Sequence, residues 1–97
     1  MKSLELALAS FENKEADHAY LAEQLDFPNY YGKNLDALYD VLTTEINAPV
    51  WVRFDFSGLG DMTLVTYYKR MLKVFQDASQ EVPEILVTAS GIVDNEE

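Results

Sequence analysis

The chain of 97 residues predicts one α/β domain of two layers, in which a three-stranded parallel sheet carries its helices on one face. Three observations support this fold class. Short segments of alternating apolar and polar residues are separated by longer segments with helical spacing, which is typical of parallel strands joined by helices. Hydrophobic residues form 48% of the chain, enough for one core, and no repeat or linker divides it. The alternation within the strands leaves one sheet face polar, so only the other face needs a cover.

The first strand is expected at residues 4–8, where leucine occupies every second position. A helix is expected from Asn13, a suitable N-cap, to Leu25. Its core face is predicted to comprise Ala16, Ala19, Tyr20 and Leu25. Pro28 ends this region, and Gly32 in the following loop is the position most able to adopt a positive φ.

A second helix is expected at about 34–46, followed by a strand at 50–56 whose apolar residues alternate. A turn with a short helical piece near Leu59 leads to a long helix at about 63–81, and a third strand is expected at 85–87. The residues predicted to face the core are Leu35, Leu38, Val41, Leu42 and Ile46 in the second helix, and Leu64, Tyr68, Met71, Leu72, Phe75 and Ala78 in the third.

Residues 1–90 are expected to form the domain, and residues 91–97 an acidic, flexible tail. The net charge is −10, from 17 acidic and 7 basic residues. A field of this sign disfavours direct binding of nucleic acid and attracts cationic partners, although solubility alone would also account for it. The chain lacks cysteine, which excludes disulfides and a thiolate zinc site and fits a reducing cytoplasm. Glu5 interrupts an apolar run too short for a secretion signal, and no segment approaches a membrane span.

His18 is the only histidine in the chain. Without a second histidine or a cysteine, it cannot anchor a transition-metal site or serve in a conventional catalytic triad. A histidine inside an amphipathic helix is more often packed and hydrogen-bonded, and we expect that structural role here. The sequence therefore predicts neither a resident metal nor a cofactor.

Asp36 and Asp40 stand four residues apart on the solvent face of the second helix, near Tyr30 and Tyr39. Like charges at this spacing destabilise an isolated helix by about 0.2–0.5 kcal/mol. A catalytic acid/base pair would need a cleft to separate the two pKa values, which a convex helix face does not offer. A divalent cation would need more ligands than two carboxylates. Contact with arginine or lysine side chains of a partner needs neither, and a simple solvated face remains the alternative.

The run Tyr-Tyr-Gly-Lys-Asn-Leu-Asp-Ala-Leu-Tyr-Asp-Val-Leu-Thr at residues 30–43 closely resembles the loop-and-helix signature of the barstar family. The order of the elements agrees, and the spacing holds without a gap from His18 to Ser90. The resemblance implies a barstar-like fold and an intracellular inhibitor of the immunity or antitoxin type, without catalysis of its own. Such an inhibitor occludes the active site of a basic barnase-type ribonuclease, and its carboxylates occupy the places of RNA phosphates. A free monomer is expected.

The resemblance also carries over contact positions, of which Asp40 matches the dominant aspartate of the family. The partner-binding residues it implies are Tyr30, Asn34, Leu35, Asp36, Tyr39, Asp40, Thr43, Thr44, Glu45 and Asp77. Some positions depart from barstar. Lys33 replaces an acid, Tyr39 a tryptophan, Thr44 and Glu45 a glycine and a tryptophan, and Asn47 a glutamate. We therefore expect either a related ribonuclease with a different rim or, as the alternative, a barstar-fold interaction module with another toxin or a non-nuclease partner.

Overall fold

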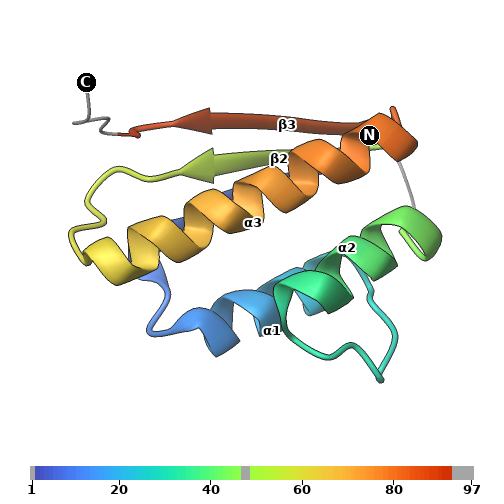
Figure 1. The fold of residues 1–97 in the computed structure, drawn as a ribbon, viewed down its shortest axis with the longest axis horizontal. Helices are drawn as coiled ribbons and strands as arrows, with labels where there is room; N and C mark the ends of the chain where they lie inside the picture. The colour runs from blue at the N-terminus through green and yellow to red at the C-terminus, as the bar shows by residue number, and fades with distance from the viewer. Residues whose placement is uncertain (1, 47–48, 93–97) are drawn as a thin grey trace.

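The computed structural model describes residues 2–46 and 49–92. Its elements follow the predicted order, as Figure 1 shows. They are β1 (Lys2–Ala7), a short 3₁₀ helix η1 (Leu8–Ser10), α1 (Lys14–Gln24), α2 (Leu35–Thr44), β2 (Val50–Asp55), α3 (Met62–Glu81) and β3 (Ile85–Ser90). Asn47 and residues 93–97, which include most of the expected tail, lie outside the described residues.

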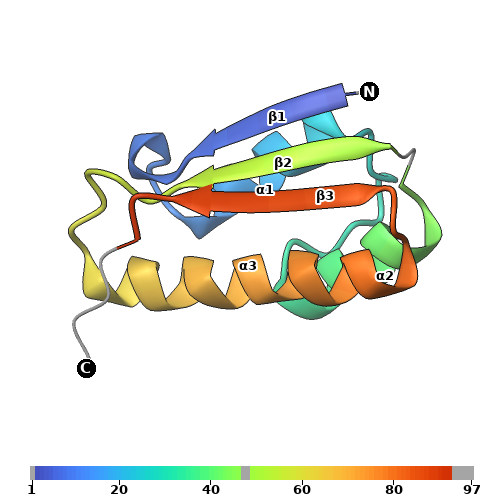
Figure 2. The ribbon, with the colours of Figure 1, turned by 90° about the horizontal axis from the view of Figure 1, so that it is seen from above.

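The three strands form one parallel sheet in the order β1-β2-β3. Figure 2 shows the strands side by side with the helices beyond them, on one side of the sheet. Burial follows the pleat: in β2, Val50, Val52 and Phe54 are buried, whereas Trp51 between them is exposed on the uncovered face. The predicted α/β fold, a three-stranded parallel sheet with helices on one face, is confirmed.

The core fills the space between the covered face of the sheet and the three helices, and one cluster of buried side chains spans all of these elements. Its largest fully buried members include Tyr68, Phe54, Phe75, Leu6, Leu21, Leu38, Leu42, Met71 and Ile85. The Phe54 ring meets the Phe75 ring at 5.4 Å in a T-shaped arrangement, which joins the central strand to the long helix. The apolar faces predicted for the second and third helices are buried or packed against this cluster.

Each α-helix begins at a side chain that accepts hydrogen bonds from its first turn. Asn13 accepts from the Ala16 N–H at 2.8 Å, and Asn34 accepts from the Ala37 N–H at 2.8 Å. The Asp61 carboxylate accepts from the Thr63 N–H at 2.9 Å, which starts α3 one residue before the predicted position. These caps satisfy N–H groups that have no partner within the helix.

Two expectations for the first half of the chain are wrong. Ala19 is exposed, because α1 turns Asp17 and His18 toward the core instead. The positive φ angles of the following loop belong to Asp26 (58°) and Lys33 (57°), not to Gly32. Lys33 is the residue just before the N-cap of α2, so the left-handed turn falls there and the glycine before it keeps an ordinary conformation.

Three further boundaries differ from the prediction. Leu8 is buried, but in η1 rather than in the first strand. No helical piece forms near Leu59 in the described structure, where a turn at 57–58 connects β2 to α3. The third strand extends to Ser90 because its last three residues pair with Arg53–Asp55 of β2. Their side chains are exposed, so no apolar alternation marked this part of the strand.

The end of β3 makes a specific demand on Gly91, which has a φ of 74° and lies against the turn after β2. A Cβ at this position would lie 2.6 Å from the Ser57 backbone nitrogen. We predict that Gly91→Ala lowers the free energy of unfolding by at least ~1 kcal/mol, from left-handed strain alone. Gly60→Ala is the matched control, because a Cβ there meets nothing within 4 Å. Urea denaturation of the two variants checks this, and equal losses would contradict it.

Candidate functional site

The predicted contact residues lie on α2 and on the loop that enters it, with one further residue on α3. Asp36 and Asp40 are both exposed, one turn apart on the outer side of α2, whose inner side is buried by Leu38, Val41 and Leu42. Asn34 holds the start of this helix as its N-cap, and Leu35 packs partly against the core. The amphipathic pattern of α2 therefore directs both carboxylates away from the fold.

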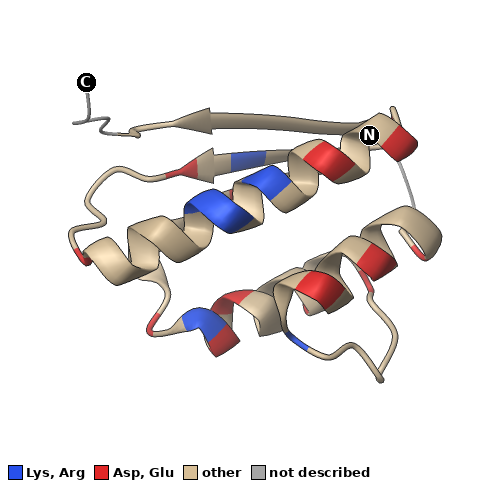
Figure 3. Ribbon diagram, in the orientation of Figure 1, with Lys and Arg blue, Asp and Glu red and all other residues tan. Residues whose placement is uncertain are grey.

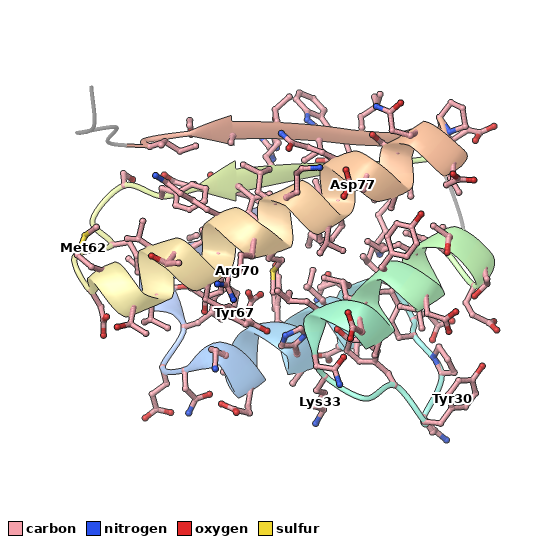
Figure 4. The ribbon with its side chains drawn as sticks, in the orientation of Figure 1. Tyr30, Lys33, Met62, Tyr67, Arg70 and Asp77 are labelled. Atoms are coloured by element: carbon pink, nitrogen blue, oxygen red, sulfur yellow. The ribbon has the colours of Figure 1, made fainter. Side chains whose placement is uncertain are left out.

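Tyr30 joins the loop to the far end of α2. Its side chain is 72% exposed, and its hydroxyl donates to the Glu45 carboxylate at 3.1 Å. This hydrogen bond and the charge of Glu45 raise the pKa of Tyr30, and the charge of Asp40 acts in the same direction. Figure 4 shows the Tyr30 ring at the outer end of the loop. The Tyr30 ring and the carboxylates of Asp40 and Glu45 therefore share one exposed surface.

The two threonines near the end of α2 use their hydroxyl protons within the helix. The Thr43 hydroxyl donates to the Tyr39 carbonyl at 2.9 Å, and the Thr44 hydroxyl donates to the Asp40 carbonyl at 2.7 Å. Each oxygen keeps its lone pairs for a donor from outside. Tyr39 is 37% exposed on the same helix. These groups therefore offer acceptors and an aromatic surface to a partner rich in lysine or arginine.

Asp77 is exposed on α3, and its charge is already compensated. The Lys73 ammonium lies 2.6 Å from the Asp77 carboxylate, one helical turn away. The other ion pair in the described part of the chain joins Arg53 to Glu5 at 4.0 Å, so neither Asp36 nor Asp40 is paired there. Figure 3 shows this contrast, with acidic segments along α2 and basic segments in the middle of α3.

The arrangement of these carboxylates suits a protein surface better than a reaction centre. Asp36 and Asp40 are exposed on the outer face of an amphipathic helix. Within residues 2–46 and 49–92, no group of three or more histidine, cysteine, aspartate or glutamate side chains could hold a metal ion. Two exposed carboxylates on one helix have the freedom to meet guanidinium or ammonium groups in bidentate or single contacts.

His18 lies behind the candidate surface, buried at the junction of α1, the loop and α3. Its Nδ1 is 2.5 Å from the Tyr31 hydroxyl, and its Nε2 is 2.6 Å from the Tyr67 hydroxyl. The expectation of a packed and hydrogen-bonded histidine is confirmed. Burial lowers the pKa of His18 to about 4 and outweighs the charge of Glu15, which acts in the opposite direction. The imidazole is therefore neutral over most of the pH range.

Asp17 is a buried residue that sequence reasoning missed. Its side chain has no exposed surface, and both carboxylate oxygens lack a hydrogen-bond partner in the described structure. Burial raises the pKa of Asp17 to about 7. The available signal was its position, because residues 17, 21 and 25 are spaced by one helical turn and Leu21 and Leu25 are both in the core. An aspartate in such a stripe is assigned to the surface by residue type alone.

Comparison with known proteins adds two findings to this geometry. Residues 1–91 match the protein family described as Barstar (barnase inhibitor). The chain is also 42% identical over 77 residues to a Bacillus subtilis (strain 168) protein named "Putative ribonuclease inhibitor YrdF", a match that covers 76% of this chain and 81% of that protein. Of the helices in the described structure, none is long and apolar enough to cross a membrane.

Asp17 and His18 make opposite contributions to the pH dependence of stability. The Asp17 pKa rises from 3.8 in the unfolded chain to about 7, so the folded state alone holds this proton between those values and stability falls as pH rises. The His18 pKa falls from 6.5 to about 4, so the unfolded state alone holds that proton and stability rises with pH. Between about pH 4 and 6.5 the two contributions cancel.

We predict that single substitutions expose each contribution. Relative to the unmodified protein, Asp17→Asn leaves the His18 contribution, so its stability rises with pH between about 4 and 6.5. His18→Gln leaves the Asp17 contribution, so its stability falls over the same range. Each difference approaches a factor of ten in the unfolding constant per pH unit. Urea midpoints at three pH values measure both, and parallel profiles for the three proteins would refute the prediction.

Proposed function

Because the chain belongs to the barstar family, we propose that it is a protein inhibitor that binds a basic, barnase-type ribonuclease and occludes its active site. One observation carries the proposal: Asp36 and Asp40 are exposed on one side of α2, without an ion pair in the described structure, beside the exposed Tyr30 ring. Uncompensated carboxylates on a rigid helix complement a cationic active-site cleft.

In the proposed complex the carboxylates take the places of RNA phosphates. Asp40 lies in the middle of the candidate surface, with Asp36 one turn earlier and Tyr30 and Glu45 beyond it. Arginine or lysine side chains that bind a phosphate group would form charge-assisted hydrogen bonds to these oxygens. The net charge of −10 accelerates the encounter with such a partner at low ionic strength. In this proposal the protein binds the enzyme and catalyses no reaction itself.

The residues at the edge of the candidate surface favour a ribonuclease whose residues around the active site differ from those of barnase. Lys33 is exposed beside the N-cap of α2 and places a positive charge there. Glu45 is engaged by Tyr30, and Tyr39 is partly exposed between the two aspartates. We propose that the protein acts in the cytoplasm and neutralises a ribonuclease before it can degrade cellular RNA. Partner capture followed by an RNA-cleavage assay distinguishes this from binding to a non-nuclease protein.

Asp40 is expected to be the single most important side chain for binding. We predict that Asp40→Ala weakens ribonuclease binding by about 2 kcal/mol or more, because a buried cation on the enzyme then loses its counter-charge. This magnitude is taken from charge pairs at other interfaces, barnase–barstar among them. Since Asp40 is exposed, its loss changes stability by no more than about 0.5 kcal/mol. Calorimetric titration and thermal unfolding measure the two effects, and Glu12→Ala, which removes the same charge elsewhere, is the control.

The mechanism is tested by comparing two triple variants of equal charge. Asp36→Asn, Asp40→Asn and Asp77→Asn together remove the three predicted contact acids of α2 and α3, whereas Glu5→Gln, Glu12→Gln and Glu15→Gln remove three acids outside the predicted contact residues. Both sets weaken the long-range field similarly, so pure electrostatic steering predicts equal losses of inhibition. Occlusion of the active site predicts a large loss of inhibition, mainly through faster dissociation of the complex, for the variant without Asp36, Asp40 and Asp77 alone. Titration of RNA cleavage at physiological salt decides, and equal losses would reject phosphate mimicry.

A further inference from the structure

The loop between α1 and α2 sends one tyrosine outward and the next one inward. Tyr30 is exposed, whereas Tyr31 is buried and its ring meets the Phe27 ring at 4.8 Å. The Tyr31 N–H also donates to the Pro28 carbonyl at 3.0 Å. Because the two tyrosines are neighbours in the chain, the direction of the exposed ring depends on how the buried one is held.

His18 connects this loop to the rest of the fold. The imidazole contacts the Tyr31 hydroxyl through Nδ1 and the Tyr67 hydroxyl through Nε2, so one side chain of α1 joins the loop to α3. Figure 4 shows Tyr67 in the space between α3 and α1. Elsewhere in the described structure, the side-chain hydrogen bonds of the loop reach only Glu45 and the start of α2. Beside the backbone hydrogen bond from the Phe27 N–H to the Ala22 carbonyl of α1, the link through His18 is therefore the side-chain hydrogen-bond connection of the loop to α1 and α3 in the described structure.

The neutral imidazole suits this position because it has one N–H donor and one lone pair. It can donate to one tyrosine hydroxyl and accept from the other, so both contacts are satisfied at once. The charged groups near His18 are Lys14 and Glu15 on α1 and Lys33 in the loop. On the α3 side the Lys14 ammonium lies 4.8 Å from the centre of the Tyr67 ring, in a groove that Arg70 also lines.

Asp17 adds a second titratable group to the same region. Burial raises the pKa values of Tyr67 and Tyr68, and the charge of Asp17 raises both further. The Tyr68 hydroxyl is buried and, like the carboxyl of Asp17, has no hydrogen-bond partner in the described structure. An ionised buried carboxylate requires donors, and the tyrosine hydroxyls are the donors in its vicinity. Of the two, the Tyr67 hydroxyl is also in contact with His18, so ionisation of Asp17 would compete with His18 for it.

We propose that His18 is the positioning residue of the partner-binding loop, through Tyr31 and Tyr67, and that ionisation of the buried Asp17 carboxyl loosens this hold. The consequence for binding rests on the proposed function, but the order of the loop does not. In the free protein, the polar link keeps Tyr30 in place beside Asp40. In the complex, a loop that is already ordered loses less conformational entropy.

The first test uses amide hydrogen exchange of the free protein. Removing one hydroxyl, by Tyr31→Phe or by Tyr67→Phe, is expected to accelerate exchange at the hydrogen-bonded loop amides of Phe27 and Tyr31 about five- to tenfold, the effect of one lost hydrogen bond. The amides of α3 should not change. Tyr20→Phe is the matched control, because Tyr20 is partly buried against Phe11 outside this network. Unchanged loop exchange in both network variants would overturn the proposal.

The pH dependence separates positioning from simple packing. After correction for the intrinsic exchange rate, protection of the loop amides is expected to decrease between pH 6 and 8 in the unmodified protein. Asp17→Asn and Asp17→Leu should remove this decrease, because neither side chain can ionise. The two variants differ in polarity and shape, so a folding defect in one leaves the other informative. The same decrease in both variants would exclude control by Asp17.

The last measurement connects the loop to the partner. Affinity for a barnase-type ribonuclease should fall in Tyr31→Phe in proportion to the ordered fraction of the loop, which the exchange protection measures, since only that fraction is competent to bind. The pH dependence of affinity between 6 and 8, relative to the unmodified protein, should shrink in Asp17→Asn. If the ordered fraction of the loop falls and affinity does not, the loop is positioned but does not bind. If no ribonuclease binds the unmodified protein, the proposed function fails, and the exchange data still decide the role of His18.

Discussion

The covered face of the parallel sheet is the constraint on which the rest of the structure depends. Val50, Val52 and Phe54 of the central strand supply an apolar surface on one side only, so every helix must bury its apolar stripe there. The two helices between β1 and β2 have to share this space with α3. As a result, α2 presents its polar side to solvent, and the loop before it lies at the edge of the core. The candidate surface is a consequence of this packing.

Aspartate side chains of this fold occupy two opposite environments, one exposed to water and one buried. Asp36 and Asp40 remain in water, where a charge costs little and stays available to a cationic partner. Asp17 is fully buried, and the same chemical group stays largely protonated there below neutral pH because no donor satisfies its oxygens in the described structure. The formal charge of −10 therefore overstates the charge of the folded protein near neutral pH. Whether an acidic side chain of this protein carries its charge near neutral pH therefore depends on its burial.

Much of this architecture could be predicted from the sequence, because the local signals agreed with the global fold. The N-cap asparagines, the apolar stripes of α2 and α3 and the alternation in β2 all indicated elements that the structure contains. Ala19 was misplaced and the burial of Asp17 was missed because tertiary packing, not residue type, sets the rotation of α1. Positive φ was assigned to Gly32 by propensity, whereas the entry into α2 places it at Lys33. The resemblance supplied candidate contact positions, which stay predictions, but not the Lys73–Asp77 pair, which depends on a side-chain conformation.

The buried polar groups explain how a short loop can have a better-defined shape than its apolar contacts alone would give. Tyr31 contributes an aromatic ring to the core and a hydroxyl to His18. Its position is therefore fixed both by packing of the ring and by the direction of the hydrogen bond. Apolar contact alone tolerates small rotations, whereas hydrogen bonds at both imidazole nitrogens specify one orientation. The carboxyl of Asp17 works against this order once it ionises, because burial without a partner is costly. In this proposal, the order of the loop and its sensitivity to pH arise from the same small cluster.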